Sequence, residues 1–428
     1  MNTLTLVFVV ALVTSAGTHL WLARRQIRHL RAHRDAVPAS FRARIDLAAH
    51  RKAADYGCAK SRLNLVGTGV GFGLALLWTL GGGLRWLDSA WKEFGLGALT
   101  LGVAVIACYA LISAALELPV DIYATFITEQ RFGFNRTRVS TYVVDRVKLL
   151  LLAVALGVPL LYAVLFLMQR ADRLWWLYVW LLWMVFSLGL TWAYPALIAP
   201  LFNKFTPLAD AGLKQRIEAL LARCGFSSRG VFVMDGSARS AHGNAYFTGF
   251  GRNKRIVFFD TLMDKLAPEE IEAVLAHELG HFRLKHVLQH LVLGALLSLA
   301  GLAVLGWLAA SPWFYSGLGV ARSSAYMALL LFSLFVPPVL FLLEPVTSAW
   351  SRRHEFQADA YATRQADGRA LITALVKLYR DNATSLTPDP LYSAFNDSHP
   401  PALARIAALN RQLAAATDCR APVSPAAS

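Results

Sequence analysis

Charged side chains are scarce in this chain. Only 16% of its 428 residues are Asp, Glu, Lys or Arg, whereas an average soluble domain carries roughly 25%. Hydrophobic residues make up 56%, and the mean hydropathy is +0.46. A single water-soluble core cannot hide so large an apolar surplus. The composition excludes a disordered chain, a collagen and a small secreted module, and it predicts an integral membrane protein.

Cysteine is also scarce, and no two cysteines form a C-x-x-C pair. The four residues are Cys58, Cys108, Cys224 and Cys419. Their scatter excludes a disulfide framework and a thiolate metal site. A metal ion in this protein must therefore be held by histidine and carboxylate side chains.

Seven apolar stretches are long enough to cross a bilayer, which takes roughly 20 residues. They are Leu4–Ala23, Leu63–Leu84, Leu96–Leu116, Leu149–Met168, Leu174–Phe202, Leu291–Ala310 and Ala325–Leu343. The last contains Pro337 and Pro338, so we expect a kink there. The sequence thus predicts a multi-pass protein whose natural surroundings are the lipid bilayer.

Positive charge is distributed unevenly between the spans. Lys and Arg exceed Asp and Glu by 42 to 27, which gives a net charge of +15. Eleven basic residues lie between spans one and two and five between spans three and four, while the even-numbered connections hold one or two each. This pattern predicts cytosolic odd-numbered connections and an N-terminus on the opposite side. We therefore attribute the charge to membrane orientation and expect no nucleic-acid partner.

The spans divide the chain into five parts. These are residues 1–202 with five helices and their loops, a cytosolic segment at 203–290, two more helices at 291–343, a second cytosolic segment at 344–415 and a flexible tail at 416–428. The two cytosolic segments are predicted to meet on one side of the membrane.

Residues 277–281 read H-E-L-G-H, the H-E-x-x-H pattern. They lie in Pro268–His290, which we predict to be one helix because proline and two glutamates suit its first turn. Side chains four residues apart share a helix face, so His277 and His281 can bind one metal ion. Glu278 can take a proton from a water molecule beside that ion. The alternative is a pair of unrelated surface histidines.

A catalytic zinc ion held by two histidines needs a third ligand, usually glutamate, with the fourth position open to water. Glu355 is the candidate because it follows span seven, on the side predicted for residues 277–281. Asp359, one helical turn later, can accept a hydrogen bond from the second nitrogen of a ligating histidine. Elsewhere, E-x-x-x-D is more typical of a solvated helix face. Its position here favours a metal site.

Together these motifs resemble the type I CAAX prenyl protease family of integral-membrane zinc endopeptidases. The segments that carry the resemblance are 277–281, Ser351–Asp359, Asn244–Phe250, Arg255–Leu262, Ser398–Pro401 and Arg405-Ile406. The resemblance covers nearly the whole chain. It implies an all-α integral membrane fold in which seven transmembrane helices enclose a water-filled chamber, with a zinc metalloprotease domain at the cytosolic end.

The resemblance implies that His277, His281 and Glu355 bind one Zn²⁺ per chain and that Glu278 is the general base. Glu278 would pass the proton of the attacking water to the leaving amine in a single-step hydrolysis. We expect no acyl-enzyme, because no serine or cysteine nucleophile with a partner base lies near the motif.

Other polar residues receive roles from the same resemblance. Asp359 matches an aspartate beside the ligands that is sometimes described as a proton donor. His399 matches a histidine that stabilises the oxyanion, and Arg405 would support it. Without the resemblance, His399 would be an ordinary loop histidine before two prolines. His286 and His290 follow the motif and are expected to be solvated or to face the chamber.

A small β-hairpin is predicted upstream of the motif. Ala245–Phe250 and Ile256–Phe259 form the strands, and Gly and Asn in the residues between them suit a turn. Its edge could bind an extended peptide by β-augmentation. By resemblance, Asn244 borders the substrate groove and is a candidate to contact a substrate carbonyl. The alternative is a hairpin that only packs on the metal-binding helix.

The natural substrate is less defined than the chemistry. The Ala-, Leu- and Arg-rich composition suggests a bacterial chain, with its catalytic site on the cytosolic side of the inner membrane. Bacteria generally lack protein prenylation, so the substrate is either a lipidated C-a-a-X peptide or another membrane-associated peptide or protein. Two alternatives are a heat-shock-type quality-control metalloprotease, which would have about four spans, and a non-enzymatic transporter or scaffold.

Overall fold

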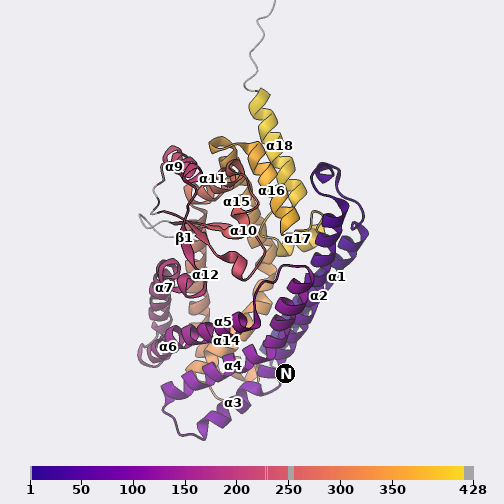
Figure 1. The fold of residues 1–428 in the computed structure, drawn as a ribbon. Coiled ribbons are helices and arrows are strands. Elements are labelled where there is room, and N and C mark those ends of the chain that lie inside the picture. The colour runs from indigo at the N-terminus through magenta and orange to yellow at the C-terminus, as the bar shows by residue number, and fades with distance from the viewer. Residues whose placement is uncertain (1, 227, 229, 249–254, 419–428) are drawn as a thin grey trace, which may run out of the picture.

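The computed structural model describes residues 2–226, 228, 230–248 and 255–418. Figure 1 shows an elongated molecule with long helices at one end and a mixed domain of helices and a small sheet at the other. Of the predicted tail, residues 416–418 end the last helix, while 419–428 lie outside the described residues. Residues 249–254, which include the predicted hairpin loop, lie outside them too.

The membrane half is built from long apolar helices, which satisfy their backbone hydrogen bonds internally as lipid requires, and from shorter helices that join them. Its helices are α1 (Thr3–Ala32), α2 (Leu47–Trp78), α3 (Gly83–Lys92), α4 (Ala98–Tyr123), α5 (Val139–Leu152), α6 (Val158–Arg170), α7 (Trp175–Ala193), α8 (Ala199–Phe202), α12 (His286–Ala309), α13 (Pro312–Gly317) and α14 (Ala325–Leu340). Short π-helical turns extend α4, join α5 to α6 and join α7 to α8.

The described helices include six that can each cross a membrane, and α2 with α3 forms a seventh span that is bent by 52°. The seven predicted spans are therefore present, but the second is not continuous as we expected. The helix ends at Trp78 instead of Leu84, and the chain turns at Gly82, whose φ of 80° lies in the left-handed region that glycine tolerates.

Contacts made by the ends of the spans show at which end of the molecule each connection lies. At the mixed-domain end, Arg25 in the C-terminal part of α1 binds Asp389 at 3.0 Å, and Arg239 binds Asp145 of α5 at 2.8 Å. At the other end, the Asn2 side chain donates to the Trp313 carbonyl at 2.8 Å. The basic connections thus lie beside the mixed domain, and the N-terminus lies opposite, as the charge pattern predicts.

The seventh span carries the chain from the membrane into the mixed domain. Pro337 and Pro338 lie within α14, and the helix tightens into a 3₁₀ turn at Phe341–Leu343 before continuing as α15 (Glu344–Gln365). Proline removes a hydrogen bond and crowds the preceding turn, which accounts for the irregularity. The apolar span predicted at Ala325–Leu343 is thus the first part of a longer helical run that extends to Gln365.

A four-stranded sheet underlies the mixed domain, with the order β1-β2-β4-β3. The remaining elements of this domain are β1 (Phe205–Pro207), α9 (Ala211–Cys224), β2 (Val231–Met234), β3 (Ala245–Thr248), β4 (Arg255–Phe259), α10 (Asp260–Met263), α11 (Pro268–Arg283), α15, α16 (Gly368–Asp381), α17 (Pro390–Asn396) and α18 (Ala402–Asp418). Strands β3 and β4 pair antiparallel, as predicted for a hairpin. The sheet is larger than the predicted hairpin, because β2 and β1 extend it beyond β4.

Helix α11 is buried at the centre of this domain, where it packs against α9, α15, α16 and β3. Its first turn is capped by Glu270, which accepts a hydrogen bond from the Ala267 amide at 2.8 Å. The prediction of one helix to His290 is wrong. Lys285, with a φ of 59°, reverses the chain after Arg283, and His286 begins α12.

Candidate metal centre

Two helices bring three side chains to one point. His277 and His281 of α11 face each other with their Nε2 atoms 3.2 Å apart. The carboxylate of Glu355 on α15 approaches both, with 3.4 Å from Oε1 to His281 Nε2 and 3.5 Å from Oε2 to His277 Nε2. Among the described residues, these three form the one group whose ligand atoms could hold a metal ion.

These distances fit a zinc ion. Tetrahedral ligands about 2.0–2.1 Å from a zinc centre lie about 3.3–3.4 Å from one another, close to the three separations found here. Glu355 Oε2 is also buried without a hydrogen bond, although His399 Nδ1 is 2.9 Å away. A buried carboxylate oxygen needs a partner, and a cation at this point supplies one. The donor set of two imidazoles and one carboxylate is that of a catalytic zinc site.

Gly280, between the two histidines, allows α15 to come this close. A Cβ atom at Gly280 would lie 3.0 Å from the Cα atom and 3.1 Å from the carbonyl oxygen of Ala358. Those are backbone atoms and cannot rotate away. The glycine of the motif therefore permits the helix contact that brings Glu355 to the histidines.

The second ring nitrogen of His277 faces a buried ion pair. Asp359 Oδ1 lies 2.9 Å from His277 Nδ1, the contact that its position one turn after Glu355 predicts. Burial alone lowers the pKa of His277, as does the Arg405 guanidinium, but hydrogen bonds to Asp359 and Glu355 outweigh them and raise it to about 9. A metal ion bound through Nε2 would replace a proton there, and Asp359 would keep the proton on Nδ1.

Arg405 is buried and forms an ion pair with Asp359. Its Nε and Nη2 atoms each donate to one carboxylate oxygen of Asp359 at 2.7 Å, and Nη2 also lies 3.2 Å from His277 Nδ1. A bidentate pair of this kind fixes the orientation of the carboxylate. We predict that Arg405 supports His399, and both side chains approach the same oxygen: Glu355 Oε2 lies 3.5 Å from Arg405 Nη1 and 2.9 Å from His399 Nδ1.

The second ring nitrogen of His281 contacts His286, a residue that we did not assign to the site. His286 Nδ1 lies 3.1 Å from His281 Nδ1, and His286 Nε2 lies 2.9 Å from Gln357 Oε1. Because the amide oxygen accepts, His286 carries its proton on Nε2 and accepts from His281 through Nδ1. The expectation of a solvated or chamber-facing His286 is wrong, since its side chain is buried.

The other predicted site residues lie around this group. Glu278 is half-buried, and no hydrogen bond or ion pair within the described part of the chain engages its carboxylate. His399 is 68% exposed in its side chain and reaches Glu355 through Nδ1. Asn244 is exposed, directly before the edge strand β3, and its carbonyl accepts from the Phe259 amide at 3.0 Å.

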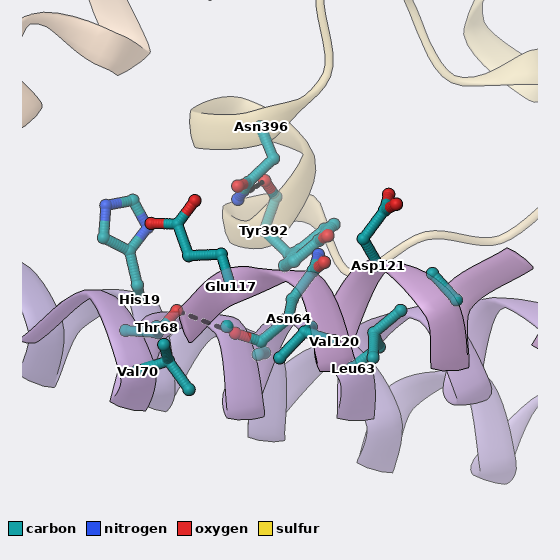
Figure 2. A pocket seen from close by; sticks show the side chains of 13 residues that line it. His19, Leu63, Asn64, Thr68, Val70, Glu117, Val120, Asp121, Tyr392 and Asn396 are labelled. Atoms are coloured by element: carbon teal, nitrogen blue, oxygen red, sulfur yellow. Dashed lines mark hydrogen bonds between the residues drawn. The ribbon is translucent and has the colours of Figure 1, made fainter. Parts of the chain in front are cut away.

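Two adjoining cavities lead from the metal-binding group towards the membrane half. One of about 540 Å³ is bordered by His399. The next, of about 590 Å³, shares Asn64, Tyr392 and Asn396 with it. Figure 2 shows Glu117 of α4 near His19 of α1, with Tyr392 and Asn396 descending from α17. These spaces correspond to the interior that we expected between the helices.

Known protein families account for almost all of this arrangement. A family model described as the CAAX prenyl protease N-terminal region, with five membrane helices, matches residues 26–204. The model of peptidase family M48 matches residues 207–413, which include the whole candidate metal centre. The chain belongs to peptidase family M48.

Individual relatives agree with the M48 assignment. The chain is 39% identical to the CAAX prenyl protease 1 homolog of Arabidopsis thaliana, over 69% of this chain and 70% of that protein. It is 33% identical to the Caenorhabditis elegans homolog, over 94% and 97%. The crystal structure of S. mikatae Ste24p superposes with a TM-score of 0.89 at 30% identity, covering 95% of this chain and 99% of that one.

As an M48 peptidase with this membrane half, the protein is a multi-pass membrane zinc metallopeptidase that acts on peptides or proteins. This sets aside the alternative of a non-enzymatic transporter or scaffold. The match of residues 26–204 to the CAAX prenyl protease N-terminal region likewise favours that group over a heat-shock-type protease.

Proposed function

We propose that this peptidase binds one zinc ion through His277, His281 and Glu355 and cleaves peptides near their C-terminus. The observation that carries the proposal is the set of three ligand atoms 3.2–3.5 Å apart. Zinc at this position supplies a Lewis acid that polarises the substrate carbonyl and acidifies water. The protein contributes the shape of the site and the movement of protons.

In the proposed reaction, Glu278 takes the proton of the attacking water and delivers it to the leaving amine. Its carboxylate is half-buried beside the imidazoles and is not engaged by other described residues. His399 donates a hydrogen bond to the carbonyl oxygen on which charge develops. Its ring borders both the metal-binding group and the 540 Å³ cavity. Asp359, oriented by Arg405, keeps His277 in the tautomer that presents Nε2.

For peptide binding, we propose that Asn244 contacts a substrate carbonyl at the edge of the sheet. Strand β3 has β4 on one side and is the last strand of the described sheet. An extended peptide can add to such an edge through main-chain hydrogen bonds. The free edge of β3 supports a role in binding the substrate peptide. The packing of β3 against α11 supports an additional role in holding the metal-binding helix.

We propose a lipidated C-a-a-X peptide as the preferred substrate, because the relatives are named CAAX prenyl proteases. A cavity of about 410 Å³, lined mainly by apolar side chains of α2 and α4 such as Val66 and Tyr123, adjoins the chamber at Leu63 and Val120. Other membrane-associated peptides remain substrates at lower efficiency.

The prenylated form of one C-a-a-X peptide should therefore be cleaved at least about tenfold more efficiently than the unprenylated form. Burying a prenyl chain contributes roughly 0.8 kcal/mol per methylene group, so even partial burial exceeds a tenfold effect. Purified protein is compared on both peptides, with Glu278→Gln as the inactive control. Equal kcat/KM values would make this a general membrane peptidase and contradict the lipid preference.

We also propose that the metal centre faces the cytosol and that the membrane is a bacterial inner membrane. The basic connections, which positive-inside topology assigns to the cytosol, pack beside the mixed domain. The host assignment rests on composition, while the relatives described above are eukaryotic. An N-terminal tag should be labelled by a membrane-impermeant reagent added outside spheroplasts. A tag accessible only after lysis would reverse the proposed orientation.

His286→Ala should weaken zinc binding by about 10- to 100-fold, the usual effect of losing the partner of a ligating histidine. Without His286 Nδ1 as acceptor, His281 is free to present either ring nitrogen to the metal. Competition with a chelator measures the affinity directly. His290→Ala is the matched control, since His290 packs on Trp350 and His354 and not on a ligand. Equal affinities for the two variants would remove His286 from the site.

A further inference from the structure

The 540 Å³ cavity beyond His399 has the size of a binding site for a small ligand or a short peptide. It lies between α2, α16, α17 and the loops that precede β3 and α18. Many of its lining side chains are neutral and polar, including Gln26, Ser61, Asn64, Asn382 and Asn396. Apart from the tyrosines Tyr56, Tyr379 and Tyr392, the titratable side chains in its wall are Lys60, His242, Asp397 and His399. Its chemistry is therefore set by few groups.

His242 is held rigidly in this wall. Its Nε2 atom lies 3.4 Å from Glu129 Oε2, and the Tyr56 hydroxyl donates to the other oxygen of Glu129 at 2.5 Å. Its ring stacks on Phe134, with the centroids 4.2 Å apart and the planes at 20°. Its Nε2 atom is thus occupied by Glu129, and the ring forms a fixed part of the cavity wall.

Lys60 contributes a positive charge to the wall of this cavity. It lies on the exposed face of α2, and its ammonium group is 5.3 Å from the centre of the Tyr56 ring, which joins it to the group around His242. The carboxyl group in the wall is that of Asp397, and burial raises its pKa. The carboxylate of Glu129 lies behind the wall, where His242 and Tyr56 contact it. Lys60 is therefore the lysine in the wall that an anionic ligand would meet.

The direction of β3 indicates which part of a peptide reaches this cavity. A peptide that pairs antiparallel with β3 has its C-terminal end at the start of that strand. His242 lies two residues before Asn244, which precedes the strand. The Asn382 side chain holds this segment by accepting from the Gly243 amide at 3.1 Å. Beyond Asn244, the C-terminal residues of the peptide would extend towards His242.

We propose that Lys60, in the wall beside His242, binds the C-terminal carboxylate of the peptide substrate. By fixing the chain end at one place, Lys60 sets how many residues separate it from the cleaved bond. This inference rests on the proposed peptidase function and adds the group that the site recognises.

The test measures binding separately from hydrolysis. The probes are a fluorescent peptide ending in Cys-Val-Leu-Ser with a free carboxylate and the same peptide as its C-terminal amide. Each is titrated into zinc-loaded Glu278→Gln protein, alone and combined with Lys60→Met. The control combination is Lys52→Met, which removes the same charge from α2 at a lysine that packs on Phe134 outside the cavity wall.

The free acid should bind about tenfold or more tightly than the amide to the Glu278→Gln protein, as expected of a hydrogen bond to a charged group. Lys60→Met should abolish the difference by weakening the acid alone, and Lys52→Met should keep it. Equal binding of acid and amide overturns the inference, because the carboxylate is then not recognised. A difference that survives Lys60→Met also overturns it and would indicate that the carboxylate binds the metal instead. A wild-type protein that binds these peptides but hydrolyses neither would contradict the proposed function alone.

Discussion

Glu278→Gln is expected to lower kcat for peptide hydrolysis by about 10²- to 10⁴-fold, the range of a general base, while the protein keeps one zinc ion per chain. Glutamine has the shape of glutamate but cannot take the proton of the attacking water. The carboxylate of Glu278 is not engaged by other described residues, so the substitution should leave the fold intact. Zinc content and kcat are measured on the same preparation.

Glu269→Gln is the matched control for this experiment. Glu269 lies on the same helix, but its carboxylate binds Arg216 at 3.0 Å on the surface. Its replacement should leave both kcat and zinc content unchanged. Residual activity of Glu278→Gln near the wild-type level would show that another group accepts the proton.

Glu355→Ala should lose stoichiometric zinc. It removes one of three ligands and leaves two imidazoles that hold the ion far more weakly. Because a metal that binds only the folded state stabilises it, excess zinc should raise the Tm of the wild type in detergent and leave that of Glu355→Ala nearly unchanged. Metal analysis after gel filtration and thermal unfolding with and without zinc measure the two effects.

Glu344→Ala serves as the control, since Glu344 begins the same helix and approaches His19 at 3.6 Å, far along α15 from the ligands. Full zinc occupancy in Glu355→Ala would mean that a different side chain completes the site. Asp359→Asn should give an intermediate result, because it alters the partner of His277 and no ligand.

The features that the sequence predicted correctly depend on local regularity. Apolar length alone identifies the spans, and spacing of four residues places His277 beside His281 and Glu355 near Asp359. The antiparallel pairing of β3 and β4 followed from turn residues between two short strands. Each of these patterns is confined to a few adjacent turns or strands, where chain geometry leaves few alternatives.

The features that were missed depend on single backbone turns or on distant contacts. Lys285 adopts a left-handed conformation, which is usually taken by glycine or asparagine. Because a lysine stands there, the sequence did not indicate where α11 ends or where His286 lies. Strand β2 is a continuous apolar run that pairs in parallel with β4, and such a run has no alternation to reveal it. The approach of Arg405 to Asp359 joins residues 46 apart in sequence.

The distribution of the three metal-binding residues has a consequence for biosynthesis. His277 and His281 emerge from the ribosome before the sixth and seventh spans, and Glu355 emerges only after both. The nascent chain therefore cannot assemble the complete ligand set until two more helices have entered the lipid and turned back. Asp389, bound by Arg25 of the first helix, is made later still. If these three residues are the ligands, metal loading should be a late event, and the protease should stay inactive through most of its own membrane insertion.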